Sequence, residues 1–227
     1  MEMQKIVDFL SQLQQNNHRE WFHAHKTEYK AIEAEFHVFV EQLILGIASF
    51  DPTVKNLTVK DCTYRIYRDT RFSKDKTPYK THIGTFICPE GKKSGNAGYY
   101  FHIEPQGESL LGFNLLSTGL YMPDKLALQS IREDIAYKGD EFLSTVKKAK
   151  GFQLDTSNCL SRVPAGFSAD NPYSEYLKLK DVYMIKMMDN QSLLAPNLLE
   201  RIVADFKNTL DFNNFLNRAI TFAREEG

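Results

Sequence analysis

The sequence predicts an α+β fold, with a mostly antiparallel central sheet flanked by N-terminal and C-terminal helices. Apolar residues recur at helical spacing in residues 1–50 and again in residues 123–227. Residues 58–118 show a two-residue alternation instead and are rich in Gly, Tyr, Thr and Phe. Short turns join the apolar runs of this middle part, which favours antiparallel strands over βαβ units.

The first fifty residues predict three helices. An apolar stripe in residues 6–13 marks the first. Asn17 can cap a short second helix at 19–26, where a glutamate three residues after Asn17 completes a capping box. A longer helix follows at 27–49, and Asp51-Pro52 ends it because the residue before proline is biased away from helical geometry.

The middle part predicts the sheet, of roughly five or six strands in all. We expect its strands at 62–67, 83–88, 98–104 and 109–116. In the first of them Cys62, Tyr64 and Ile66 share one face, because alternate residues of a strand point the same way. Gly-rich polar turns separate the later strands.

The last third returns to helix. We expect helices at 124–137, 141–150, 173–179, 196–209 and 212–224, with one late strand at 182–187. No repeat, low-complexity tract or linker interrupts the chain. We therefore expect a single domain over 1–227, in which 1–50 is helical, 58–118 is sheet-rich and 123–227 is helical with one late strand.

Composition and charge exclude several classes of protein. Aromatic residues make up 12% of the 227 residues, too many for a disordered chain. The most apolar stretch, 43–50, is about a third of a membrane span, so we expect no membrane association. The net charge of −1 and the pI near 6.6 disfavour nucleic acid as a partner, because phosphate contacts need a positive surface.

The cysteines indicate a reducing compartment. Cys62, Cys88 and Cys159 are widely spaced and odd in number, and no Cys-x-x-Cys pair exists. The sequence also lacks the His-Glu-x-x-His, Gly-x-Gly-x-x-Gly and EF-hand motifs. We therefore expect a cytoplasmic protein without a metal or cofactor; nothing in the sequence identifies a protein partner.

The segment 65–80 is the strongest departure from an ordinary surface. It holds six Lys or Arg residues and two Asp residues, a net charge of +4, whereas the rest of the chain carries −5. Guanidinium groups present forked donors that match phosphate or carboxylate oxygens in pairs. We therefore propose from the sequence a small-anion site, and its candidate residues are Arg65, Tyr67, Arg68, Arg71, Lys76, Tyr79 and Lys80.

In this hypothesis the arginines bind the anion, the lysines attract it over a longer range, and Tyr67 and Tyr79 shape the pocket. Arg65 and Arg68 lie on opposite faces of a regular strand, so both can contribute only if the strand ends or bulges near Tyr67. The alternative is a scaffold or partner-binding protein in which the segment is a structural ion-pair network. The glutamates available for such a network are Glu33, Glu35 and Glu41.

A second alternative is an enzyme, a hydrolase of a phosphate or carboxylate ester. His102 and Glu104 are two residues apart and share one strand face, and His82 lies on a neighbouring strand. Together they can form a polar pocket suited to proton transfer. The catalytic candidates are His82 or His102 as the base, with Glu104 or Asp69 orienting it.

Several blocks of the sequence resemble one family. Residues 17–22 read Asn-His-Arg-Glu-Trp-Phe, and the long basic block follows at 65–81. Similar blocks lie at 100–105, 119–123 and 162–166. In this order they resemble the domain of unknown function 2461 (DUF2461) family of conserved hypothetical proteins. The resemblance implies one whole-chain α+β domain in the cytoplasm, and it supplies neither an activity nor site residues.

Overall fold

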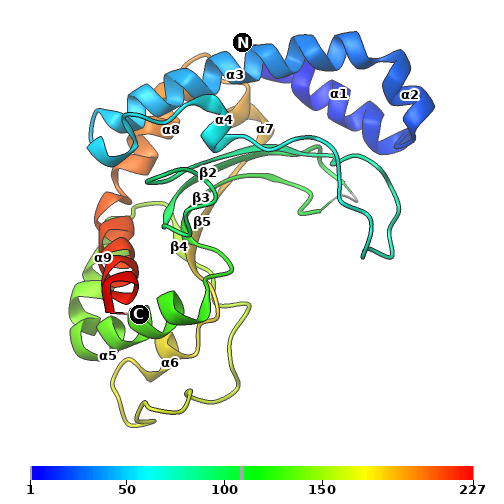
Figure 1. Ribbon diagram of the computed structural model, residues 1–227. Helices are drawn as coiled ribbons and strands as arrows, with labels where there is room; N and C mark the ends of the chain where they lie inside the picture. Colours follow the sequence, from blue (N-terminus) through cyan, green and yellow to red (C-terminus); the bar gives the residue numbers. More distant parts are fainter. Residues whose placement is uncertain (1, 108–109, 227) are drawn as a thin grey trace.

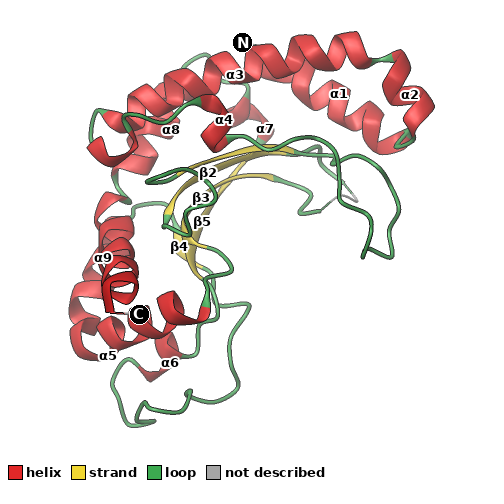
Figure 2. Cartoon of the chain, in the orientation of Figure 1, coloured by secondary structure: helices red, strands yellow, loops and turns green. Residues whose placement is uncertain are grey.

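The computed structural model of the chain describes residues 2–107 and 110–226. It confirms the α+β class: helices at both ends of the chain flank a curved, five-stranded sheet (Figures 1 and 2). All the strand pairs are antiparallel. None of the helices of the described ranges is long and apolar enough to cross a membrane.

Three N-terminal helices form close to their expected positions. They are α1 (Met3–Gln15), α2 (Arg19–Ala24) and α3 (Lys26–Ala48). The apolar stripe of α1 is buried as its spacing requires. The cap of α2 differs from the prediction, because His18 rather than Asn17 takes the N-cap position and accepts the backbone N–H of Trp21.

The prediction of a strand at 62–67 is wrong. Residues at its start belong to a short helix, α4 (Val59–Cys62), which follows the 3₁₀ turn η1 (Pro52–Val54). Thr58 and Asp61 form a capping box that stabilises this helix turn. The chain after Cys62 is extended but pairs only through isolated bridges, one of them between Thr63 and Thr85.

The sheet has the strand order β1-β2-β3-β5-β4. Its strands are β1 (Ile83–Ile87), β2 (Gly98–Ile103), β3 (Asn114–Leu120), β4 (Gln153–Leu154) and β5 (Val182–Met188). The strand expected at 109–116 lies further along the chain, at 114–120, and residue 109 is outside the described residues. The last third contributes two strands instead of one, since the short β4 pairs with β5 at the sheet edge.

The C-terminal third adds further helices. They are α5 (Lys125–Lys148), α6 (Ser174–Leu177), α7 (Asn190–Leu193), α8 (Leu198–Lys207) and α9 (Leu210–Glu226). Of these, α8 and α9 lie along the outer side of the sheet, and α6 packs on α5 (Figure 1). The two helices expected at 124–137 and 141–150 are one helix with a kink at Lys138. Next to the kink, Gly139 leaves room for the ring of Tyr173, which a Cβ at that position would meet at 2.2 Å.

Successive side chains of β2 point to opposite faces of the sheet. Phe101 packs on Phe39 of α3, and Tyr99 packs on Phe206 of α8, so this face belongs to the core. Figure 1 shows these helices along the outer side of the curved sheet. Tyr100 and His102 therefore point to the opposite face, next to the basic segment.

Candidate functional site

The basic segment folds as a hairpin-like loop at the edge of the sheet. The N–H of Arg68 donates to the carbonyl of Pro78 (2.9 Å), and the N–H of Lys80 donates to the carbonyl of Ile66 (2.8 Å). These bonds hold the two arms of the loop antiparallel. They bring Arg65 and Lys80, fifteen positions apart in the chain, to the same end of the loop.

The base of this loop is fixed in the core by Tyr79. Its ring is 3% exposed and stacks on Phe22 of α2, with ring centroids 4.0 Å apart. The side-chain amide of Asn17 donates to the carbonyl of Tyr79 (2.9 Å) and its oxygen accepts the N–H of Tyr79 (3.1 Å). Tyr79 is thus a core residue that places the loop, and Tyr67, which is 47% exposed, packs against its edge.

Two of the three arginines in this segment pair within the loop itself. Arg71 forms two hydrogen bonds to the carboxylate of Asp69, at 2.6 and 3.0 Å. Arg68 donates to Asp75 and to the hydroxyl of Thr77. The glutamates suggested by the sequence as partners are not involved in these pairs, which form between residues two to nine positions apart.

These local partners also set the protonation of the two aspartates. The pKa of Asp69 falls to about 2 because Arg71 donates to it. The pKa of Asp75 also falls to about 2, first through the backbone N–H of Thr77 and then through Arg68. Both carboxylates stay charged at neutral pH. Asp69 therefore forms its ion pair with Arg71 of the same loop and does not orient a histidine.

Lys76 turns toward the loop as well. Its ammonium donates to the carbonyl of Thr70 (2.9 Å). Of the cations expected to bind an anion, Arg68, Arg71 and Lys76 thus have partners inside the loop. The remaining two, Arg65 and Lys80, face a cleft between the loop and α3.

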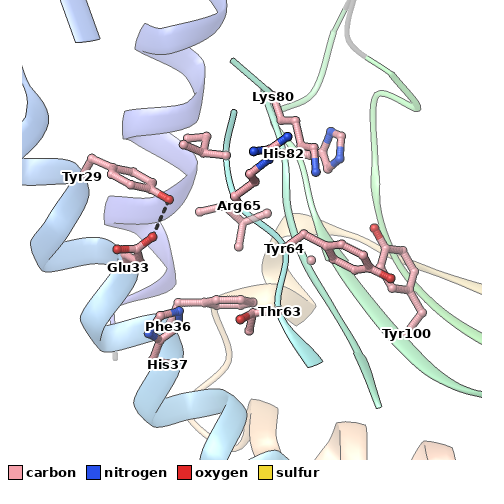
Figure 3. Close-up of a pocket in the computed structure, with 13 residues that line it drawn as sticks. Tyr29, Glu33, Phe36, His37, Thr63, Tyr64, Arg65, Lys80, His82 and Tyr100 are labelled. Carbon is pink, nitrogen blue, oxygen red and sulfur yellow. Dashed lines mark hydrogen bonds between the residues drawn. The ribbon is translucent and has the colours of Figure 1, made fainter. Parts of the chain in front are cut away.

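The cleft is a small, partly enclosed space of about 30 Å³ (Figure 3). Arg65, Lys80 and His82 lie together on one side of it, and Tyr29 and Glu33 of α3 lie on the other. The ammonium of Lys80 lies 5.3 Å from the ring centroid of Tyr64, a cation–π contact. The ion pairs that the described loop residues form are Arg68–Asp75 and Arg71–Asp69, and Arg65 and Lys80 take part in neither.

Glu33 is the acidic side chain of the cleft wall, and its carboxylate already has two donors. The hydroxyl of Tyr29 donates to one of its oxygens at 2.8 Å, and the ammonium of Lys30 pairs with the other. Much of its charge is thus balanced within α3. The opposite wall keeps an excess of positive charge.

Burial, and then this excess of positive charge, lower the pKa values of the basic groups Lys80 and His82. Burial lowers the pKa of Lys80, and the neighbouring Arg65 lowers it further. The pKa of His82 falls to about 4, mainly because its ring is buried. Charge on His102, Lys80 and Arg68 acts in the same direction, and Glu104 opposes it. His82 is therefore neutral at pH 7.

The structure brings together the three residues expected to form a polar pocket. The rings of His82 and His102 stack with centroids 4.9 Å apart. His102 Nε2 lies 3.1 Å from a carboxylate oxygen of Glu104, and both side chains are buried, at 1% and 0% exposure. Asp69 is not part of this group, since it pairs with Arg71.

Tyr100 completes this group and was missed from the sequence. Its hydroxyl lies 2.9 Å from His102 Nδ1, and the residue lines the cleft. The two-residue alternation that placed His102 and Glu104 on one face places Tyr100 there too. That spacing was the available signal, because a lone tyrosine in an aromatic-rich strand does not stand out.

Comparisons with known proteins give one match. The family model described as "Conserved hypothetical protein (DUF2461)" matches residues 5–215. No curated protein and no solved structure matches the chain.

Proposed function

We propose that this chain, which belongs to the DUF2461 family of conserved hypothetical proteins, binds a small anion in the cleft between α3 and the basic loop. The ligand carries a phosphate or a carboxylate group. Arg65 and Lys80 are its main contacts, and His82 lies beside them.

One observation carries the proposal: Arg65 and Lys80, which form no ion pair with the described residues, converge on a partly enclosed cleft. Arg65 is exposed and Lys80 is half-buried, and holding two like charges close together is unfavourable unless a counter-charge is present. Burial lowers the pKa of Lys80, and repulsion from Arg65 lowers it further. A bound anion supplies the counter-charge, and the guanidinium of Arg65 can hold two of its oxygens at once.

The size of the cleft limits what enters it. Its volume of about 30 Å³ exceeds the roughly 10–15 Å³ that one water molecule needs. The cleft therefore has room for about two water-sized groups, so oxygens of a small oxyanion can enter it, whereas the rest of a larger molecule such as a nucleotide stays outside. A doubly charged phosphate group suits two cations better than a single carboxylate does. Phosphate is accordingly the first ligand to test.

The scaffold alternative accounts for part of the segment. Arg68 and Arg71 stabilise the loop through Asp75 and Asp69, which is what a structural ion-pair network does. These pairs are exposed or half-exposed, so each contributes little to stability. They do not explain why Arg65 and Lys80 lie together at the cleft. If the cleft is an anion site, removal of Lys80 weakens anion binding. If the segment is only a structural ion-pair network, there is no anion binding to weaken.

The test is thermal unfolding with a panel of anions, using wild type, Lys80→Met and Lys92→Met. Lys92 is a matched control, because its ammonium also lies over the ring of Tyr64 (5.8 Å) but it does not line the cleft. Phosphate at about 100 times its dissociation constant should add about 2.7 kcal/mol, a rise of several degrees.

Lys80→Met removes one charged donor, which is worth about 1.5–3 kcal/mol, so we expect phosphate affinity to fall roughly 10- to 100-fold. Lys92→Met should respond like wild type. Equal responses of the two variants, or a shift produced only by a short single-stranded RNA in the panel, would contradict the proposal.

The proposal includes a reducing, cytoplasmic setting. The three cysteines are free, and Cys62 and Cys88 are buried. Burial raises the pKa of the Cys62 thiol to about 12 and that of Cys88 to about 11, so both are unreactive thiols at neutral pH.

A further inference from the structure

Tyr100, His102 and Glu104 form a hydrogen-bonded chain that leads from the cleft into the protein. Glu104 is at its inner end, where its carboxylate accepts backbone N–H groups of Leu110 (2.5 Å), Leu111 (2.9 Å) and Gly112 (3.2 Å). These donors fix the position of the carboxylate. Glu104 in turn fixes the ring of His102, at 3.1 Å from Nε2.

Which atom donates in each of these hydrogen bonds follows from the protons that each group carries. An ionised carboxylate only accepts hydrogen bonds, so His102 Nε2 carries the proton that points to Glu104. His102 Nδ1 is then the acceptor, and the hydroxyl of Tyr100 donates to it across 2.9 Å. The proton of Tyr100 is thus already directed at a base, and the residue itself lines the cleft.

The neighbouring strand leaves room for this hydroxyl. Gly84 of β1 pairs with His102 of β2, and a Cβ at Gly84 would lie 2.6 Å from the Tyr100 oxygen. Any other residue at 84 would displace the hydroxyl. Tyr100 also lines the same cleft as Arg65 and Lys80, where Figure 3 shows it beside Tyr64.

We propose that the cleft is a phosphoryl-transfer site, in which Tyr100 is the nucleophile, His102 the general base and Glu104 a positioning residue. The inference rests on the proposed anion binding, because Arg65 and Lys80 must hold the phosphate group. The order of nucleophile, base and orienting carboxylate is the one that activates hydroxyl nucleophiles in other enzymes. The substrate class is a phosphate monoester.

The first step forms a bond between the Tyr100 oxygen and phosphorus and breaks the ester P–O bond. The Tyr100 proton passes to His102 Nδ1 and stays there, while the departing alcohol oxygen, on the opposite side of phosphorus, takes a proton from solvent water. In the second step water attacks phosphorus from the side that the alcohol left and gives its proton to the hydroxide formed in the first step, and the Tyr100 oxygen leaves with the proton held by His102. The net change is hydrolysis of the ester to an alcohol and phosphate. Arg65 and Lys80 stabilise the charge on the phosphoryl oxygens throughout.

Burial raises the pKa of the Tyr100 hydroxyl, with Tyr64 and Glu104 adding to the effect, so it is protonated at pH 7 and needs the base. Tyr64 lines the same cleft and lies beside Lys80, and burial raises the pKa of its hydroxyl too, to about 12, so the contact with His102 is what distinguishes Tyr100. Tyr64→Phe is therefore a matched control for Tyr100→Phe.

Vanadate tests the inference without knowledge of the leaving group, because it adopts the five-coordinate geometry of phosphoryl transfer. Transition-state analogues bind at least about 100-fold more tightly than ground-state ligands. We expect wild type and Tyr64→Phe to bind vanadate at least about 100-fold more tightly than phosphate. Tyr100→Phe should bind both anions equally and keep the phosphate affinity of wild type.

Hydrolysis of 4-nitrophenyl phosphate tests turnover directly. We expect release of nitrophenolate by wild type and Tyr64→Phe, and a loss of at least about 100-fold in Tyr100→Phe and in His102→Gln. In Glu104→Gln we expect kcat to fall with KM unchanged, because the ring of His102 loses the carboxylate that orients it. The charged or titratable groups that face His102 are Tyr100, Glu104 and the stacked His82.

The outcomes separate this inference from the anion site itself. Phosphate binding by wild type without a vanadate preference or turnover would overturn the inference and leave the proposed function standing. Absence of phosphate binding would overturn both. A vanadate preference that survives in Tyr100→Phe would also overturn it, as would hydrolysis of 4-nitrophenyl acetate alone.

Discussion

His82 makes the stability of the protein depend on pH in a defined window. Its pKa is about 4 in the folded protein and about 6.5 in an unfolded chain. Between these values the unfolded chain binds a proton that the folded protein does not. The free energy of unfolding therefore falls as the pH falls from about 6.5 to 4. Above pH 6.5 the titration of His82 does not change the free energy of unfolding.

The size of this effect follows from the gap of about 2.5 pH units. At about 1.36 kcal/mol per unit it amounts to about 3 kcal/mol below pH 4, and this is an upper bound because solvent reaches the half-buried ring. His82→Asn removes the titrating ring. We expect the variant to lack this part of the acid destabilisation, whatever its stability at pH 7.5.

Urea unfolding at several pH values between 7.5 and 4 measures the effect. The wild-type free energy of unfolding should approach that of His82→Asn, or fall below it, as the pH decreases. Parallel curves for the two proteins would refute the argument. Sulfate, whose charge is constant over this range, should bind more tightly to wild type at pH 5 than at pH 7, because the anion favours a protonated His82.

Three further substitutions test the fold by urea unfolding at neutral pH. Asn17→Ala removes both bonds to the backbone of Tyr79, so we expect a loss of about 1–3 kcal/mol, and an unchanged midpoint would mean that these bonds do not hold the loop. Gly119 has φ +112° and a Cβ there would lie 2.4 Å from the carbonyl of Val182, so Gly119→Ala should lose about 3 kcal/mol; a neutral result would contradict the packing of β3 on β5. Phe72 is 94% exposed, so Phe72→Ser should change the free energy by less than about 0.5 kcal/mol, and a larger loss would show that Phe72 is packed in solution.

The helices and most strands could be predicted because their apolar residues keep one period over many positions. The strand at 62–67 failed for the opposite reason. Cys62 and Ile66 are buried as a strand would require, but the four residues Val59–Cys62 form a capped helix turn. A segment this short does not distinguish the helical period of 3.6 residues from the strand period of 2. The cap residues Thr58 and Asp61 were the better signal.

The location of the candidate site could be predicted, whereas its partners could not. The concentration of positive charge in 65–80 marked the loop that borders the cleft. Which cation faces the cleft depends on the pairing of the loop arms and on Asn17, which bonds to Tyr79 across 62 positions. Such long-range contacts carry no local sequence pattern, so Arg65 and Lys80 could not be separated from Arg71 beforehand.

The most direct test of the anion site is isothermal titration of phosphate into wild type, Arg65→Gln and Arg71→Gln. Arg71 is a matched control of equal charge, since it belongs to the same segment and pairs with Asp69. We expect one phosphate per chain, an affinity at least about 10-fold lower in Arg65→Gln, and no change in Arg71→Gln. No binding by wild type, or an equal loss in both variants, would contradict an anion site built on Arg65 and Lys80.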